Sequence, residues 1–220
     1  MRKKAVIFDL DGTLWDVTQS TYISANLIAS KYGLDNIDVK TICKGFGTNK
    51  EESAKLYFPN LELEESLKYI YEIGTTNLEL LNDKKFDLFK NEIETLKLLN
   101  TEYDLYIVSN TSRNEYIEAF LNNSGAKELI KGYIAASSLD ITKSEAIKKI
   151  IVDYNIENAV YVGDTLKDQI AAKEAGVDFI QAKYGFGEDL HAQYSINEIT
   201  ELPIVLARIF VNLWEKEDNK

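Results

Sequence analysis

The sequence predicts an α/β protein with a parallel sheet and a helical insertion after the first strand. Two observations predict this class. Short apolar runs recur five times and alternate with stretches in which apolar residues have helical spacing. Residues 16–85, between the first two runs, show helical spacing and no confident strand. Because strands that alternate with helices are joined by right-handed crossovers, the expected sheet is parallel.

The core elements are expected in a regular order along the chain. Strands are predicted where apolar residues run without interruption, at residues 5–8, 105–108, 133–136, 159–162 and 179–182. Helices are predicted from helical spacing at residues 86–100, 114–122, 142–153, 170–175 and 203–214. Thr142, with Glu145 three residues later, has the pattern of a capping box. These elements predict a doubly wound, Rossmann-like sheet, in which polar residues at the carboxyl ends of the strands meet in one crevice.

The chain is expected to form two domains. We expect residues 1–15 and 86–220 to form the α/β core and residues 16–85 to form a small all-α domain. The hinges between them are predicted at residues 16–17 and 83–85.

The small domain should contain several helices, predicted at residues 18–32, 50–57 and 63–81. Thr18 or Ser20 could cap the first of them, and Gly33 fits the position after its end. Residues 44–50 are rich in glycine and predict a loop.

Composition limits the partners of the protein. The chain has 220 residues and a net charge of −11, which argues against nonspecific binding to nucleic acid or to an anionic membrane. An anionic substrate would need local positive charge from a metal ion, a lysine or backbone N–H groups. A single cysteine, Cys43, excludes an intrachain disulfide framework and favours a reducing compartment such as the cytoplasm.

The sequence offers no targeting or membrane segment. Only four apolar residues follow the basic residues at positions 2–4, too few for a signal-peptide core. No apolar run approaches the length of a membrane span. We therefore expect no membrane partner. We also expect a small-molecule partner and a monomer or a homodimer.

Two aspartates end the first predicted strand. Asp9 and Asp11 follow four apolar residues and precede a Gly-Thr turn. Burying carboxylates beside an apolar strand is costly unless a cation or hydrogen bonds compensate them. Ser109 and Asp164 follow the second and fourth strands, so all four side chains should meet at one edge of the sheet. The arrangement predicts a metal site there.

These residues carry a family resemblance that covers nearly the whole chain. Four stretches resemble, in order, the motifs of the haloacid dehalogenase (HAD) superfamily in its phosphatase and phosphomutase form: Asp9-x-Asp11-Gly12-Thr13, Ser109, Lys143, and Gly163-Asp164-Thr165-x-x-Asp168. Residues 161–164, 171–176 and 184–187 resemble its phosphoglycolate-phosphatase-like branch.

The resemblance implies a role for each acidic residue. Asp9 would be the nucleophile and form an aspartyl-phosphate. Asp11 would protonate the leaving alcohol, then act as base toward water, and give the metal its backbone carbonyl. Asp9, Asp11 and Asp164 would bind Mg²⁺, which removes the repulsion between a carboxylate and a phosphate ester. Asp168 would lie outside the metal ligands and either orient the site or pair with Lys143.

Three further residues are expected to bind the phosphoryl group. The resemblance implies that Ser109, with Asn110 beside it, donates hydrogen bonds to the transferring oxygens. Lys143 would neutralise the charge that builds on them. His191, the one histidine, lies in a polar stretch and is not expected to take part in catalysis.

The helical insertion lies between the first motif and Ser109, a position that resembles that of the C1 cap in this superfamily. A cap of this kind would close over the site, exclude water and contribute to specificity. Within the loop at residues 44–50, Thr48 and Asn49 are the expected substrate contacts. The alternative interpretation of this loop is an ordinary turn between helices.

The resulting hypothesis is a Mg²⁺-dependent phosphatase of a small phosphorylated metabolite. Asp11 favours phosphoester chemistry, since haloacid dehalogenases of this fold lack the second aspartate. One alternative is a phosphomutase, similar to β-phosphoglucomutase, on the same scaffold. Another is a non-catalytic binding protein with the HAD fold. The sequence does not predict which phosphate ester is the substrate.

Overall fold

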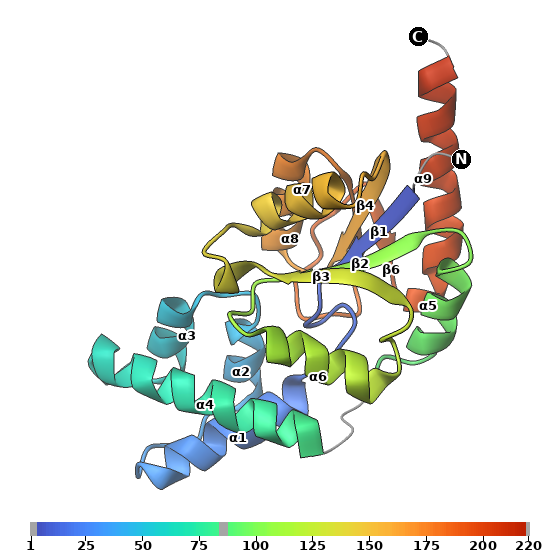
Figure 1. Cartoon of the computed structure of the whole chain (residues 1–220). Helices are drawn as coiled ribbons and strands as arrows, with labels where there is room; N and C mark the ends of the chain where they lie inside the picture. The colour runs from blue at the N-terminus through green and yellow to red at the C-terminus, as the bar shows by residue number, and fades with distance from the viewer. Residues whose placement is uncertain (1–3, 84–87, 219–220) are drawn as a thin grey trace. The chain divides into compact units, whose positions relative to one another are not determined.

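The structure is a computed structural model that describes residues 4–83 and 88–218, with side chains described up to residue 82 and from 88 to 211. The chain divides into two compact units, one made of residues 1–15 and 88–220 and the other of residues 16–87. Figure 1 shows their elements.

The first unit contains a six-stranded parallel sheet with the strand order β3-β2-β1-β4-β5-β6. Its strands are β1 Lys4–Phe8, β2 Asp104–Ser109, β3 Ile130–Ala135, β4 Asn158–Gly163, β5 Asp178–Ala182 and β6 Tyr194–Ile196. This confirms the predicted α/β class and the parallel sheet. β1 lies between β2 and β4, and the strands that follow β1 in the chain are added first on one side of it and then on the other. Doubly wound sheets bind their ligands at the point where this direction reverses.

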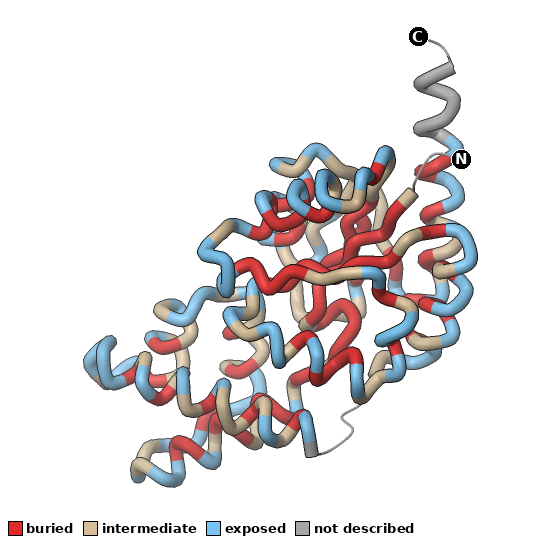
Figure 2. The backbone as a smooth tube through the Cα atoms, in the orientation of Figure 1, coloured by how far each residue is buried: buried red, intermediate tan, exposed pale blue. Residues whose placement is uncertain are grey.

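The apolar runs explain why the central strands form. In β1, residues 5–8 are fully buried, since helices cover both faces of the sheet and leave no solvent-facing side. The buried segments in Figure 2 follow the same central strands. β6 was not predicted, because its three residues, Tyr-Ser-Ile, contain no apolar run.

Helices pack on both faces of this sheet (Figure 1). On one face α7, Lys143–Asp153, and α8, Leu166–Ala175, bury small and aliphatic residues such as Ala146, Ile147 and Ala171 against the strands. The opposite face carries α5 Glu92–Leu99, α6 Asn114–Ser124 and α9 Leu202–Asp218. Short 3-10 turns, Ala136–Ser138 and Ile199–Glu201, precede α7 and α9.

One core helix begins later than predicted. A helix was expected from residue 86, but α5 begins at Glu92, and residues 88–91 are not helical. Asn91 has a left-handed backbone with φ 60°, which helical residues do not adopt, so the helix cannot extend back through it. The expected residues 86 and 87 lie outside the described part of the chain.

The second unit is helical throughout its described secondary structure. Its helices are α1 Thr18–Lys31, α2 Val39–Gly45, α3 Lys50–Tyr57 and α4 Leu63–Asp83. Their shared core contains Ile28, Ile42, Phe58 and Tyr69. Glu72 of α4 accepts hydrogen bonds from Lys31 and Tyr32, which fastens α4 to the end of α1.

The start of α1 also differs from the prediction. Neither Thr18 nor Ser20 caps the helix; its N-cap residue is Val17, and Asp16 accepts a hydrogen bond from the Thr18 N–H at 3.1 Å. Gly33 follows the helix with φ +68°, as expected. Of the predicted hinge at 83–85, residues 84 and 85 lie outside the described residues.

No helix in the described ranges is both long and apolar enough to cross a membrane.

Candidate active site

A tight turn after β1 positions the two aspartates. The Asp9 N–H donates to the carbonyl of Val162 in β4 at 2.8 Å, so Asp9 continues the sheet. The carbonyl of Leu10 then accepts hydrogen bonds from the N–H groups of residues 13–15, which folds the chain back on itself. Gly12 has φ +81°, and a Cβ there would collide with the Asp164 carboxylate. The turn therefore needs glycine both for its backbone and for the approach of Asp164.

Lys143 joins two of the acidic residues. Its ammonium donates to Asp9 Oδ1 at 2.8 Å and to Asp168 Oδ1 at 2.6 Å. All three side chains are buried. The predicted capping box, in which Thr142 and Glu145 exchange hydrogen bonds, fixes the start of α7 and so places Lys143 at its first residue.

Hydrogen bonds occupy both carboxylate oxygens of Asp168. Besides Lys143, Oδ1 accepts from the Tyr161 hydroxyl at 3.3 Å. Oδ2 accepts from the N–H of Thr165 at 3.0 Å and from its hydroxyl at 2.6 Å. Asp168 is therefore both the capping-box acid of α8 and the partner of Lys143.

Asp164 has one hydrogen-bonded oxygen and one oxygen with no partner among the described residues. Oδ2 accepts from the N–H groups of Phe186 at 2.7 Å and Gly187 at 3.2 Å. A Cβ at Gly185 or Gly187 would collide with Asp164, so glycine lets this loop lie directly against it. Oδ1 is buried and has no hydrogen-bond partner among the described residues. Buried carboxylate oxygens are rarely left unpaired, so this atom indicates a ligand that the protein itself does not supply.

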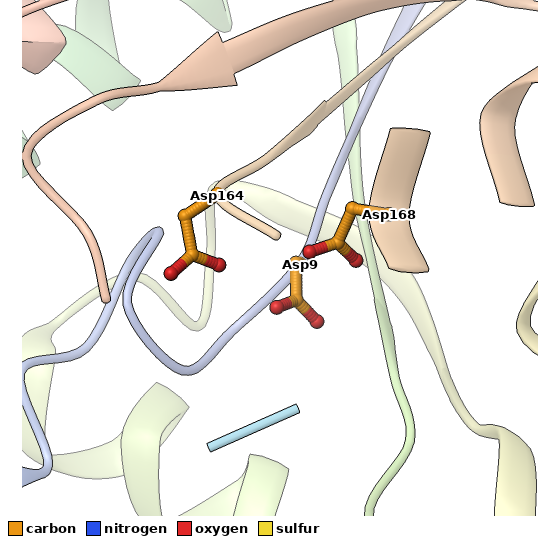
Figure 3. Close-up of side chains that lie close together, drawn as sticks. All are labelled: Asp9, Asp164 and Asp168. Carbon is orange, nitrogen blue, oxygen red and sulfur yellow. The ribbon is translucent and has the colours of Figure 1, made fainter. Parts of the chain in front are cut away.

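The carboxylates of Asp9, Asp164 and Asp168 form one cluster, with an oxygen from each within 4.8 Å of the others (Figure 3). The cluster could hold a divalent metal ion. Lys143, Tyr161 and Thr165 donate hydrogen bonds to both oxygens of Asp168. The carboxylates of Asp9 and Asp164 therefore have more capacity to act as metal ligands than that of Asp168. The unpartnered oxygen of Asp164 fits this assignment.

Burial controls the charge of the acidic groups. It raises the pKa of Asp9 well above its usual value, and the nearby charge of Asp168 adds to this effect although Lys143 opposes it. Burial likewise raises the pKa of Asp164 to about 7 and that of Asp11 to about 6. Burial would lower the pKa of Lys143, but the charges of Asp168 and Asp9 outweigh it and raise that pKa. The carboxylates would therefore ionise more readily with a further cation among them.

Asp11 lies in the same turn but has a different partner. Its Oδ1 accepts a hydrogen bond from the Tyr116 hydroxyl of α6 at 2.9 Å. Its side chain is less buried than that of Asp9. Sequence reasoning missed Tyr116, since it is 105 residues away from Asp11 and belongs to no recognisable motif.

Ser109 lies at the same edge of the sheet as Asp9. It ends β2, which pairs with β1 through Phe8 and Ile107, and only 3% of it is exposed. Its hydroxyl oxygen accepts from the Thr111 N–H at 3.2 Å. The neighbouring Asn110 has an exposed side chain, and its carbonyl accepts from the Ser137 hydroxyl at 2.7 Å.

Thr48 and Asn49 lie in the helical unit, between α2 and α3. The Thr48 hydroxyl donates to the Gly45 carbonyl at 2.6 Å, and the Asn49 side chain accepts from the Glu52 N–H at 2.8 Å as the N-cap of α3. These contacts are those of a turn between helices. The structure thus brings Asp9, Asp11, Lys143, Asp164 and Asp168 into one site, places Ser109 at the same sheet edge, and gives Thr48 and Asn49 a local structural role.

Comparison with known families identifies the class of protein that this fold and site define. The family model for haloacid dehalogenase-like hydrolases matches residues 6–182. The chain belongs to that family, which confirms the predicted superfamily and the predicted hydrolase class.

The curated relatives are named as phosphatases. A phosphoglycolate phosphatase of Synechococcus elongatus is 27% identical over 199 residues, which cover 84% of this chain and 86% of the relative. A crystal structure of a predicted phosphoglycolate phosphatase from Haemophilus somnus matches with a TM-score of 0.82 at 20% identity, and the match covers 94% of this chain and 99% of that protein. The structure of a HAD-like hydrolase from Streptococcus pneumoniae matches with a TM-score of 0.81 at 22% identity, and the match covers 92% of this chain and 97% of that protein. Both structures share the fold of this chain over nearly their full length.

Proposed function

We propose that the chain is a Mg²⁺-dependent phosphatase that hydrolyses a small phosphorylated metabolite, with Asp9 as the residue that carries the phosphoryl group. The observation that supports this most strongly is the buried cluster in which Lys143 bonds Asp9 while Asp164 presents an unpartnered oxygen. Membership of the HAD-like hydrolases and the names of the curated relatives point to the same reaction class.

Asp9, Asp164 and the backbone carbonyl of Asp11 would hold the metal ion. Oxygen ligands of this kind suit Mg²⁺, which when bound would neutralise the charge of a phosphate ester. A chain with a net charge of −11 needs such local compensation to accept an anionic substrate.

The two aspartates at the end of β1 divide the chemistry between them. Lys143 holds one oxygen of Asp9, and the other oxygen attacks phosphorus as the bond to the leaving oxygen breaks. Asp11 gives its proton to that leaving oxygen. As a carboxylate, Asp11 then takes a proton from a water molecule that attacks the phosphoaspartate, and phosphate leaves while Asp9 regains its carboxylate.

Other residues at the sheet edge stabilise the transferring group. Ser109 and Asn110 would donate hydrogen bonds to its oxygens, and Lys143 would offset the charge that develops on them. Since Lys143 is already held by Asp9 and Asp168, it needs little reorganisation when the charge appears.

We propose further that the helical unit is a C1 cap that excludes water during the reaction. Substrate contacts from Thr48 and Asn49 belong to this proposal, although both side chains already bond within their own turn. The names of the curated relatives make 2-phosphoglycolate the first substrate to test.

The test is phosphate release by the purified full chain after removal of metal and readdition of Mg²⁺. We expect Mg²⁺-dependent release from at least one member of a panel that contains 2-phosphoglycolate, sugar phosphates and nucleotides. Asp9→Asn should abolish it, whereas Asp35→Asn, which removes an exposed carboxylate from the other unit, should leave it unchanged. No release from any ester by the Mg²⁺-loaded chain would contradict the proposal.

The same assay separates the phosphomutase alternative. A mutase would return an isomerised sugar phosphate with little free phosphate, because it passes the phosphoryl group to a second hydroxyl rather than to water. Isomerisation faster than phosphate release would replace the phosphatase assignment with that alternative.

A further inference from the structure

Helix α6 contacts the turn that carries Asp11 through a side-chain hydrogen bond and through ring packing. In its first turn, Tyr116 donates its hydroxyl proton to Asp11 Oδ1 at 2.9 Å. The ring of Tyr116 also packs against Trp15, with centroids 5.5 Å apart, and Phe120 packs against the same indole at 5.5 Å.

Trp15 closes the turn in which Asp11 lies. Its carbonyl accepts a hydrogen bond from the Gly12 N–H at 2.9 Å, and its N–H donates to the carbonyl of Leu10 at 2.9 Å. Only 1% of Trp15 is exposed. The backbone on both sides of Asp11 is therefore fixed by Trp15, whereas the orientation of the Asp11 carboxylate depends on its own side-chain contact.

Tyr116 supplies that contact. An aspartate side chain can rotate about two bonds, and a proton donor works only when it lies within hydrogen-bond reach of the atom that it protonates. Small displacements of such a group are costly in rate, because the geometry of the reacting atoms must be nearly correct before the reaction starts. A hydrogen bond to Oδ1 fixes the plane of the carboxyl group and leaves Oδ2 for proton transfer.

We propose that Tyr116 is a positioning residue that orients the Asp11 carboxyl group for proton transfer to the leaving oxygen. The inference rests on the proposed function, since it takes the role of Asp11 from it. Tyr116 acts through Asp11 and needs no contact with the substrate.

The test compares Tyr116→Phe with the wild-type chain on two aryl esters of similar shape, phenyl phosphate and 4-nitrophenyl phosphate. Phenolate is a poor leaving group and needs a proton, whereas 4-nitrophenolate leaves with little assistance. Because kcat/KM reports the steps up to the first departure of the leaving group, it isolates the proton that Asp11 donates. We expect kcat/KM to fall roughly tenfold or more for phenyl phosphate and by less than about threefold for 4-nitrophenyl phosphate.

The chain provides a matched control. The Tyr133 hydroxyl donates to Glu118 Oε1 at 2.7 Å, also a tyrosine-to-carboxylate bond to α6 but at an exposed position. Tyr133→Phe should leave both esters unaffected. Tyr116→Phe keeps the aromatic ring, and thermal unfolding of both variants checks that the packing of this ring against Trp15 is preserved.

The outcomes separate this inference from the proposed function. Equal losses on both esters, or no loss on either, would overturn the positioning role while leaving the phosphatase intact. A wild-type chain that hydrolyses neither ester nor any other phosphate would contradict the proposed function and the inference with it.

Discussion

Glu92 gives a sharp prediction about the stability of the core unit. It is the first residue of α5, and only 1% of it is exposed. Its Oε2 accepts a hydrogen bond from the Phe89 N–H at 3.2 Å, and its Oε1 has no partner among the described residues. Burial raises the pKa of Glu92 from 4.5 to about 9, although the Phe89 hydrogen bond lowers it. The folded chain therefore keeps Glu92 protonated at neutral pH.

This raised pKa makes folding stability depend on pH. Above about pH 4.5 the unfolded chain loses the proton from Glu92, while the folded chain retains it until the pH approaches 9. The contribution of Glu92 to stability is thus fully present below pH 4.5 and is lost as the pH rises through this window. Each pH unit corresponds to about 1.4 kcal/mol, so the loss between about pH 5 and about pH 8 is at most about 4 kcal/mol.

Glu92→Gln removes the titration and keeps an oxygen for the Phe89 N–H. We expect the free energy of unfolding of the variant, relative to wild type, to increase by several kcal/mol between about pH 5 and about pH 8. Urea unfolding at a series of pH values measures it.

Glu94→Gln is the control, because Glu94 lies in the same first turn of α5 but is exposed. The difference in free energy of unfolding between Glu94→Gln and wild type should not change between about pH 5 and about pH 8. If the same difference for Glu92→Gln is equally constant with pH, the argument from burial is refuted.

Three other predictions concern the site. Lys143→Met leaves the carboxylates of Asp9 and Asp168 buried without their cation, so urea unfolding without metal should show a loss of about 3–5 kcal/mol; unchanged stability would contradict the ion-pair geometry. Gly187→Ala puts a methyl group against the backbone carbonyl of Asp164, so calorimetry should find that the variant binds Mg²⁺ roughly tenfold more weakly than wild type. An equal affinity would argue against the glycine loop as a support for Asp164. Burial raises the pKa of Asp164 to about 7 and that of Asp9 above its usual range, so Mg²⁺ binding should release protons and should weaken as the pH falls from about 8 to about 6. Calorimetry in buffers of different ionisation enthalpy measures the proton release, and its absence would contradict this prediction.

The sequence predicted those parts of the fold that local patterns determine. Uninterrupted apolar runs located the central strands, and Thr142 with Glu145 located the start of α7. The prediction failed where no local pattern exists. β6 has three residues, and its place in the sheet depends on pairing with β5. The late start of α5 depends on the left-handed backbone of Asn91, which apolar spacing does not reveal.

The site shows the same division between local and distant information. Asp9, Asp11 and Asp164 could be selected because each follows an apolar strand, and the topology brings such strand ends together. Tyr116 could not be selected, since its bond to Asp11 joins residues 105 positions apart. The burial of Glu92 could not be predicted either, because it follows from tertiary packing and not from a local pattern.

Trapping the phosphoryl group on Asp9 tests the proposed function most directly. The Mg²⁺-loaded chain would be mixed with its best substrate, quenched in acid during turnover, reduced with borohydride and mapped by mass spectrometry. An acyl phosphate on Asp9 would be reduced to homoserine at that position, and we predict this product there and at no other aspartate. Steady turnover with Asp9 unmodified, or with the product at another aspartate, would contradict the account.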